Sequence, residues 1–208
     1  MRGAMLTFLR YGGAMILRLG TNLVLTRLLF AEVFGLMALV SVLVQGVQMF
    51  SDVGIGPSII RSKRANDPVF LDTLWTVQVV RGFGQWLVMG LLAWPFAKFY
   101  GDPQLLQMVP VIGLSAVILG FGSTKQYTQN RELRLGGLMI MELAAQAAGA
   151  AMMITLAYFM QSVWALVFGT LFNNLVRTAL SFLILPGPNN RLRWEPEARA
   201  ELFGFGRW

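Results

Sequence analysis

The residues that could do chemistry in this 208-residue chain are charged side chains placed inside otherwise apolar stretches. The basic ones are Arg18, Arg81 and Arg177, and the acidic ones are Asp52 and Glu142. An ionised side chain at the centre of a bilayer costs a few kcal/mol, so such residues face a protein interior or a wet cavity. The set is net cationic, and the guanidinium fork fits phosphate. It therefore predicts a site for an anionic group.

Uncharged polar residues accompany the deep charges at helical spacing. Side chains three or four positions apart lie on one helix face. These positions hold amides and a hydroxyl: Thr21 and Asn22 near Arg18, Gln45 and Gln48 before Asp52, Gln78 and Gln85 around Arg81, Gln146 after Glu142, and Asn173 before Arg177. One such residue alone is typical of an interhelical hydrogen bond. Five aligned polar stripes instead predict a hydrated cavity, with substrate contacts from Arg18, Asn22, Arg81, Arg177, Gln45 and Gln78.

Pairing among the deep charges is the competing interpretation. Asp52 with Arg81, and Glu142 with Arg177, would form ion pairs that fix helix packing, and even then Arg18 would have no carboxylate. Arg18 is too deep to reach the interface easily, so its partner is an anion, which we favour, or the carbonyls of a broken helix. The two carboxylates hold the arginines in place or carry a coupling ion, Na⁺ or H⁺.

Composition restricts the class of protein. The chain is 56% hydrophobic and 13% charged with a net charge of +7, and it has no Cys and no His. Soluble domains carry about 25% charged residues, so we expect a polytopic membrane protein whose basic residues lie in loops, with no nucleic-acid partner. The missing residue types exclude disulfides, thiol nucleophiles, common zinc sites and His-based catalysis. We therefore expect no metal site, no catalytic residue and no cofactor beyond a coupling ion.

The elements that must position these charges are transmembrane helices. A span needs about 20 mostly apolar residues. Charge runs and Pro or Gly turns divide the chain into six spans at residues 5–29, 34–60, 71–99, 105–127, 136–159 and 163–185. The sequence thus predicts an all-α fold with a six-helix unit over residues 1–185. Residues 186–208 are predicted to form a cytoplasmic linker and the start of a seventh helix.

The basic residues at the ends of the spans and in the loops predict the orientation of the chain. Those on one side number ten: Arg2, Arg61, Lys63, Arg64, Lys125, Arg131, Arg134, Arg191, Arg193 and Arg199. The other side has Arg27 and Lys98. Cytoplasmic loops are enriched in Lys and Arg, so the ten predict the cytoplasmic side and both termini lie there. Aromatic residues near the span ends, Tyr127 among them, are expected to anchor the helices at the interface.

Several segments resemble one protein family. The segments are, in chain order, "GAMILRLGTNLVLTRLL", "FAEVFGLMALV", "SDVGIGPSIIRSK", "LWTVQVVRG", "AKFYGDPQL", "NRELR" and "ELFGFGRW". This pattern resembles the N-terminal part of bacterial polysaccharide-biosynthesis membrane proteins, the oligosaccharide flippases of the MOP exporter superfamily. The resemblance extends over essentially the whole chain, and residues 51–57 are its most specific part.

The resemblance implies one lobe of a two-lobe transporter in the bacterial inner membrane. Its implied activity is export of a polyprenyl-diphosphate-linked oligosaccharide to the outer leaflet, for O-antigen or exopolysaccharide biosynthesis. Arg18 is the best match to a first-helix arginine thought to meet the diphosphate in related lipid II flippases, and Arg81 and Arg177 are weaker matches. The partner would be a missing C-terminal lobe, which we favour, or a second copy of the chain.

Two other functions compete with export of a lipid-linked sugar. A cation-coupled multidrug or metabolite exporter of the same fold would need an acidic, aromatic site, whereas the deep charges here are net basic. A membrane enzyme would depend on Asp, Glu or Arg alone and would lack a long extramembrane loop for a donor site. We therefore expect a transporter.

Overall fold

The computed structural model describes residues 2–51, 55–62 and 64–198, with side chains described outside residues 2–11 and 61. Every regular element in these ranges is an α-helix, which confirms the all-α expectation. The helices are α1 (Arg2–Leu28), α2 (Ala31–Phe50), α3 (Ile55–Arg61), α4 (Pro68–Tyr100), α5 (Gln104–Gly120), α6 (Lys125–Arg131), α7 (Leu135–Met160) and α8 (Trp164–Leu183).

Four of the six predicted spans each correspond to one helix, and each of the other two is divided into two helices. The predicted span 34–60 separates into α2 and α3, and the predicted span 105–127 separates into α5 and α6, which are bent by 61°. Glycines at 120 and 122 weaken the helix at the second break. Three helices, α2, α7 and α8, are long and apolar enough to cross a membrane, and the bent pair α5–α6 gives a fourth. The protein is membrane-integral; six spans stay a prediction.

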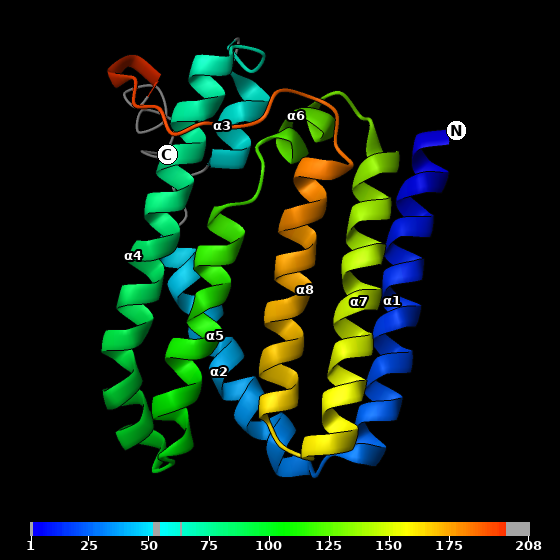
Figure 1. Cartoon of the computed structure of the whole chain (residues 1–208), viewed down its shortest axis with the longest axis vertical. Coiled ribbons are helices and arrows are strands. Elements are labelled where there is room, and N and C mark those ends of the chain that lie inside the picture. Colours follow the sequence, from blue (N-terminus) through cyan, green and yellow to red (C-terminus); the bar gives the residue numbers. More distant parts are fainter. Residues whose placement is uncertain (1, 52–54, 63, 199–208) are drawn as a thin grey trace.

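Five long helices form a row in the order α4, α5, α8, α7 and α1. Packing joins α4 to α5, α5 to α8, α8 to α7 and α7 to α1, and Figure 1 shows this row with α2 passing behind its lower end. The main apolar core lies where α2 meets the row, around Val40, Met89, Met108 and Val167. This core holds one end of the bundle together, so polar side chains can gather away from it.

Local sequence signals determine where α4 begins and ends. The side chain of Asp67 caps the helix by accepting from the Val69 amide, and Pro68 occupies the first turn, where no amide donor is needed. Gly101 ends the helix in the left-handed conformation, with φ of 69°. These signals place Arg81 near the middle of the helix.

Glycines let neighbouring helices approach closely along the row. A Cβ atom at Gly82 would lie 2.6 Å from the carbonyl oxygen of Ala116, so α4 and α5 meet backbone to backbone. A Cβ at Gly149 would lie 2.6 Å from the Cβ of Asn173 and 3.2 Å from its Cα, so α7 also packs closely against α8. Small residues at such crossings are typical of membrane helix packing. The walls around the polar residues are therefore tightly packed.

The close approach at Gly82 predicts a specific sensitivity to added volume. Gly82→Ala should push α5 away and lower the free energy of unfolding by about 1–3 kcal/mol, seen as a lower midpoint of thermal unfolding in detergent. Gly84→Ala is the matched control, because a Cβ there meets nothing within 4 Å. Equal midpoints for the two variants would contradict the packing described at Gly82.

Candidate functional site

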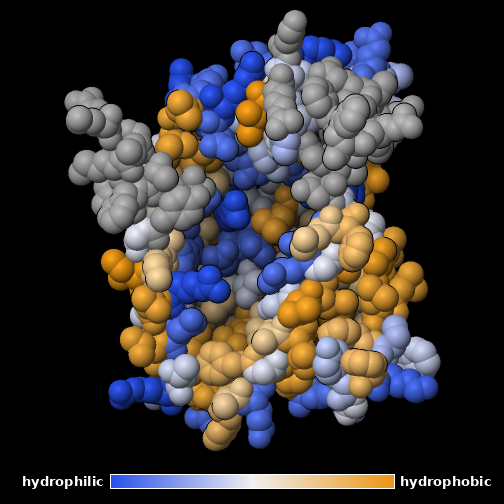
Figure 2. Space-filling view, turned by 180° about the vertical axis from the view of Figure 1, so that it is seen from behind, coloured by the Kyte–Doolittle hydropathy of each residue, from blue (hydrophilic) through white to orange (hydrophobic). Residues whose placement is uncertain are grey.

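Two polar cavities lie between the helices of the row, and α8 contributes to both. Cavity A, about 330 Å³, is lined mainly by α4, α5, α6 and α8, with Gln48 from α2. Cavity B, about 530 Å³, is lined by α1, α7 and α8. Figure 2 shows hydrophilic side chains gathered in a hollow in the middle of one face, with hydrophobic residues beside and below it. Several residues of the predicted polar stripes thus line cavities in the described structure.

Cavity B brings together polar residues from three helices that are distant in sequence. Arg18 and Asn22 come from α1, Glu142 from α7, and Arg177 from α8. The Arg177 Nη2 atom lies 3.7 Å from the Glu142 Oε1 atom, so the predicted ion pair between them forms. Arg18 is exposed and lines the same cavity. The sequence predicts no carboxylate partner for Arg18, because Glu142 is paired with Arg177.

Hydrogen bonding holds α1 against α7 beside cavity B. The Gln146 amide nitrogen donates to the Ala14 carbonyl oxygen at 2.8 Å. This amide therefore ties two walls together, as well as lining the cavity. Because Arg18 lies one turn along α1 from Ala14, the bond places its guanidinium on the same side as Glu142 and Arg177.

Cavity A contains Arg81 and a cluster of glutamines. Gln85 donates to the Ser51 hydroxyl at the end of α2 and so joins α4 to α2 beside the cavity. Asp52, with its predicted Arg81 pair, lies outside the described residues. Gln45 is exposed on α2 and stands apart from the described linings of both cavities. The structure thus gathers all the other predicted site residues in or between the two cavities.

Gln78 has a structural task that its position in the sequence did not reveal. It is only 3% exposed, and its Nε2 atom donates to the carbonyl oxygens of Leu119, Gly120 and Gly122 at 3.0–3.2 Å. These carbonyls lie at the end of α5 and just beyond it, where the helix no longer supplies amide donors from the following turn. Gln78 thus stabilises the bend, which we call the elbow (residues 121–124), while also bordering cavity A.

The elbow also brings in residues that sequence reasoning assigned elsewhere. Tyr127, expected at the membrane interface, lines cavity A and donates its hydroxyl to Gln78 Oε1 at 3.3 Å. The Trp75 indole donates to the Phe121 carbonyl at 3.2 Å, which gives the elbow a second support. The two glycines at 120 and 122 were the available signal for this bend.

A segment after α8 crosses the end of the row where α4 begins; we call residues 186–198 the strap. The Asn190 side chain bonds to Thr124 in both directions, which fixes the strap to the elbow. Further along, the Arg191 amide donates to Asp72 and the Glu195 amide donates to Thr73, both in α4. The strap thus joins α8, the elbow and α4, each of which contributes to the lining of cavity A.

Lys125 bonds to the strap and to the end of α8. It is only 5% exposed, and its Nζ atom donates to the Phe182 carbonyl at 3.2 Å and to Asn189 Oδ1 at 2.8 Å. A cation at the C-terminal end of a helix is favoured by the helix dipole. Lys125 therefore caps α8 and holds the strap where it leaves that helix.

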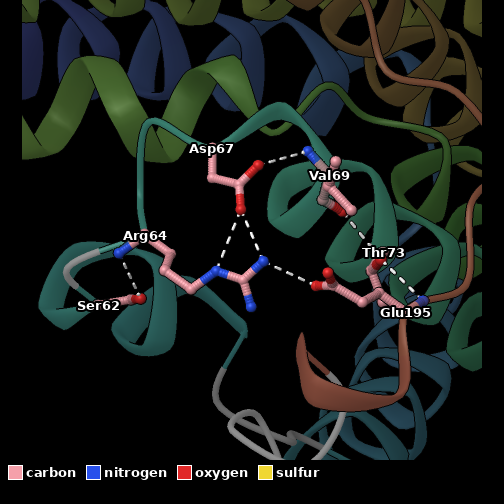
Figure 3. Close-up of polar contacts among 6 residues, drawn as sticks. All are labelled: Ser62, Arg64, Asp67, Val69, Thr73 and Glu195. Atoms are coloured by element: carbon pink, nitrogen blue, oxygen red, sulfur yellow. Dashed lines mark hydrogen bonds and ion pairs between the residues drawn. The ribbon is translucent and has the colours of Figure 1, made fainter.

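A second set of contacts holds the far end of the strap. Figure 3 shows Arg64 between the carboxylates of Asp67 and Glu195. The Arg64 Nη2 atom lies 2.6 Å from Asp67 Oδ2 and 2.8 Å from Glu195 Oε2. The Arg64 hydrogen bond lowers the pKa of Asp67, and the bonds to Asp67 and Glu195 raise the pKa of Arg64. The contribution of the ionised Asp67 carboxylate to the stability of the fold is therefore complete at neutral pH. It is lost as the pH falls through the lowered pKa of Asp67.

Loss of the Glu195 contact should loosen the strap without affecting the helices. In Glu195→Gln we expect trypsin to cleave after the exposed Arg191 and Arg193 faster than in the unmodified protein, as followed by mass spectrometry of the fragments. Glu197→Gln, at an exposed position of the same segment, should cleave at the unmodified rate. Equal rates in both variants would show that Arg64 does not hold the strap.

Comparison of the sequence with known proteins relates the chain to polysaccharide biosynthesis proteins. The family model described as "Polysaccharide biosynthesis protein" matches residues 24–208. A curated relative, the lipopolysaccharide biosynthesis protein WzxC of Escherichia coli (strain K12), is 27% identical over 157 residues, or 76% of this chain. The match covers 32% of that relative, so the chain spans about a third of its length. No solved structure matches the chain significantly.

Proposed function

Because the chain belongs to the polysaccharide biosynthesis protein family, we propose that it forms one lobe of a membrane transporter. The transporter moves a polyprenyl-diphosphate-linked oligosaccharide from the cytoplasmic to the outer leaflet of the bacterial inner membrane. The observation that carries this proposal is the pair of cavities, which gathers three arginines inside the helix row.

Charge balance supports a diphosphate as the group recognised. The described linings of the two cavities contain Arg18, Arg81 and Arg177 against one carboxylate, that of Glu142. Guanidinium groups form short, charge-assisted hydrogen bonds with phosphate oxygens. A cationic multidrug substrate would require the opposite balance. The same excess of arginine favours transport of an anionic lipid over enzymatic chemistry, which would need an acid or base.

The surroundings of the arginines suit the other parts of such a substrate. Amide side chains in cavity A, including Gln48, Gln85 and Gln126, offer donors and acceptors to sugar hydroxyls. Large apolar residues such as Ile16 and Leu23 are 72% and 68% exposed on α1, in keeping with contact to lipid. We propose that the sugar enters the cavities while the polyprenyl tail stays in the bilayer.

The proposed lobe has six spans with both termini in the cytoplasm. The strap and the basic loop around Arg64 then lie on the cytoplasmic side, where the positive-inside rule places Lys and Arg. The curated relative is longer than this chain, and a second lobe or a second copy of the chain would complete the path. Coupling to Na⁺ or H⁺ belongs to the same proposal.

The site assignment can be tested with a fluorescent polyprenyl-diphosphate sugar in vesicles that contain the protein. Arg18→Gln should weaken substrate binding about ten- to hundredfold and slow translocation, because a hydrogen bond to a charged group contributes about 1.5–3 kcal/mol. Arg27→Gln is the matched control, since Arg27 is exposed in the last turn of the same helix.

Two results would count against the proposal at different levels. Translocation by Arg18→Gln at the unmodified rate would remove Arg18 from the site. Failure of the unmodified protein to translocate any diphosphate-linked lipid would remove the function itself.

A further inference from the structure

Arg177 is the one described residue that lines both cavities. It lies on α8, between Asn173 on the side of cavity B and Thr178 on the side of cavity A. Arg18 and Arg81 each line one cavity alone. An anion entering either space therefore meets Arg177 together with a second arginine.

The backbone of α8 is held firmly around Arg177. On one side the close approach between Gly149 and Asn173 packs α8 against α7. On the other side the Thr178 hydroxyl donates to the Ile118 carbonyl of α5 at 3.0 Å. Because packed helices resist displacement, the position of the guanidinium changes through its own rotatable bonds.

The ion pair that now holds this guanidinium is loose. Its nitrogen–oxygen distance is 3.7 Å, whereas Arg64 approaches its two carboxylates to 2.6 and 2.8 Å. Charge-assisted hydrogen bonds have lengths of about 2.7–2.9 Å. The side chain of Arg177 is 41% exposed and that of Glu142 is 26% exposed. Such a solvated pair contributes little stability, so a phosphate can displace the carboxylate.

We propose that Glu142 competes with the anionic group of the substrate for Arg177. Without substrate, Glu142 pairs with the guanidinium of Arg177 in cavity B. A bound diphosphate replaces the carboxylate as the partner of that guanidinium. When the substrate leaves, the ion pair between Glu142 and Arg177 forms again. Glu142 is thus a positioning residue that weakens substrate binding and hastens release. This inference rests on the proposed function and adds the control of affinity within the same site.

A competing carboxylate has a physical use in a transporter. Two arginines without an internal anion would hold a diphosphate tightly, and a bound group that cannot leave blocks the cycle, as it does in a channel. A carboxylate that exchanges with the phosphate lowers the free-energy cost of release, because Arg177 passes from one anion to another. The loose geometry of the pair fits exchange better than a purely structural ion pair.

The test measures binding of fluorescent farnesyl diphosphate to the purified protein in nanodiscs, together with translocation of the longer lipid in vesicles. Glu142→Gln keeps the shape of the side chain and removes its charge. We expect affinity to rise about two- to fivefold, in line with the strength of an exposed ion pair, and the maximal translocation rate to fall. Glu142→Asp keeps the charge and should retain more of the unmodified affinity and rate.

A double-mutant comparison separates competition for Arg177 from a general effect of charge. In an Arg177→Gln background, Glu142→Gln should no longer raise the affinity. In an Arg81→Gln background the gain should persist, because Arg81 lines cavity A alone. A gain of equal size in both backgrounds would overturn the proposed competition.

Other outcomes are equally decisive. Weaker binding in Glu142→Gln, with a lower midpoint of thermal unfolding, would show that the pair is only structural and would overturn the inference while leaving the proposed function intact. Absence of diphosphate binding in the unmodified protein would overturn both.

Discussion

The cost of placing charge inside a membrane protein is the constraint on which this structure depends. Arginines within apolar helices must be solvated, paired or bound to an anion, and here they border two cavities that are lined by polar side chains. The apolar core where α2 meets the row leaves room for this arrangement by holding the helices together elsewhere. The same cost that makes these residues rare in membranes makes their grouping informative about function.

Helix α8 connects the parts of the molecule that matter for the proposed activity. Its residue Arg177 lines both cavities. The end of the helix continues into the strap, which is hydrogen-bonded to the elbow and to α4. One helix therefore connects both cavities to the end of the row where the strap lies. Alternating access requires such a connection between the substrate site and the opening on one side of the membrane.

The long helices could be predicted from the sequence, and the long-range contacts that hold the elbow and the strap could not. Apolar length and Pro or Gly turns located the long helices, and helical spacing brought Asn22 and Arg18 to one cavity. The elbow depends on Gln78 reaching carbonyls some 40 residues away in the chain, a contact that no local pattern contains. The strap likewise depends on long-range bonds, such as Arg64 with Glu195. Gln45 shows the limit of spacing arguments, because Gln48 of the same stripe lines cavity A whereas Gln45 lies outside both described cavity linings.

Water access and substrate protection at Asn22 test the central claim most directly. The chain has no Cys, so Asn22→Cys in cavity B and Leu19→Cys, exposed on the same helix outside the described linings, each carry one thiol. The account predicts that a charged, membrane-impermeant thiol reagent modifies Asn22→Cys much faster than Leu19→Cys, and that a polyprenyl diphosphate slows only the first reaction. Equal rates at the two positions, or modification of Asn22→Cys that the diphosphate lipid leaves unchanged, would contradict a hydrated diphosphate site.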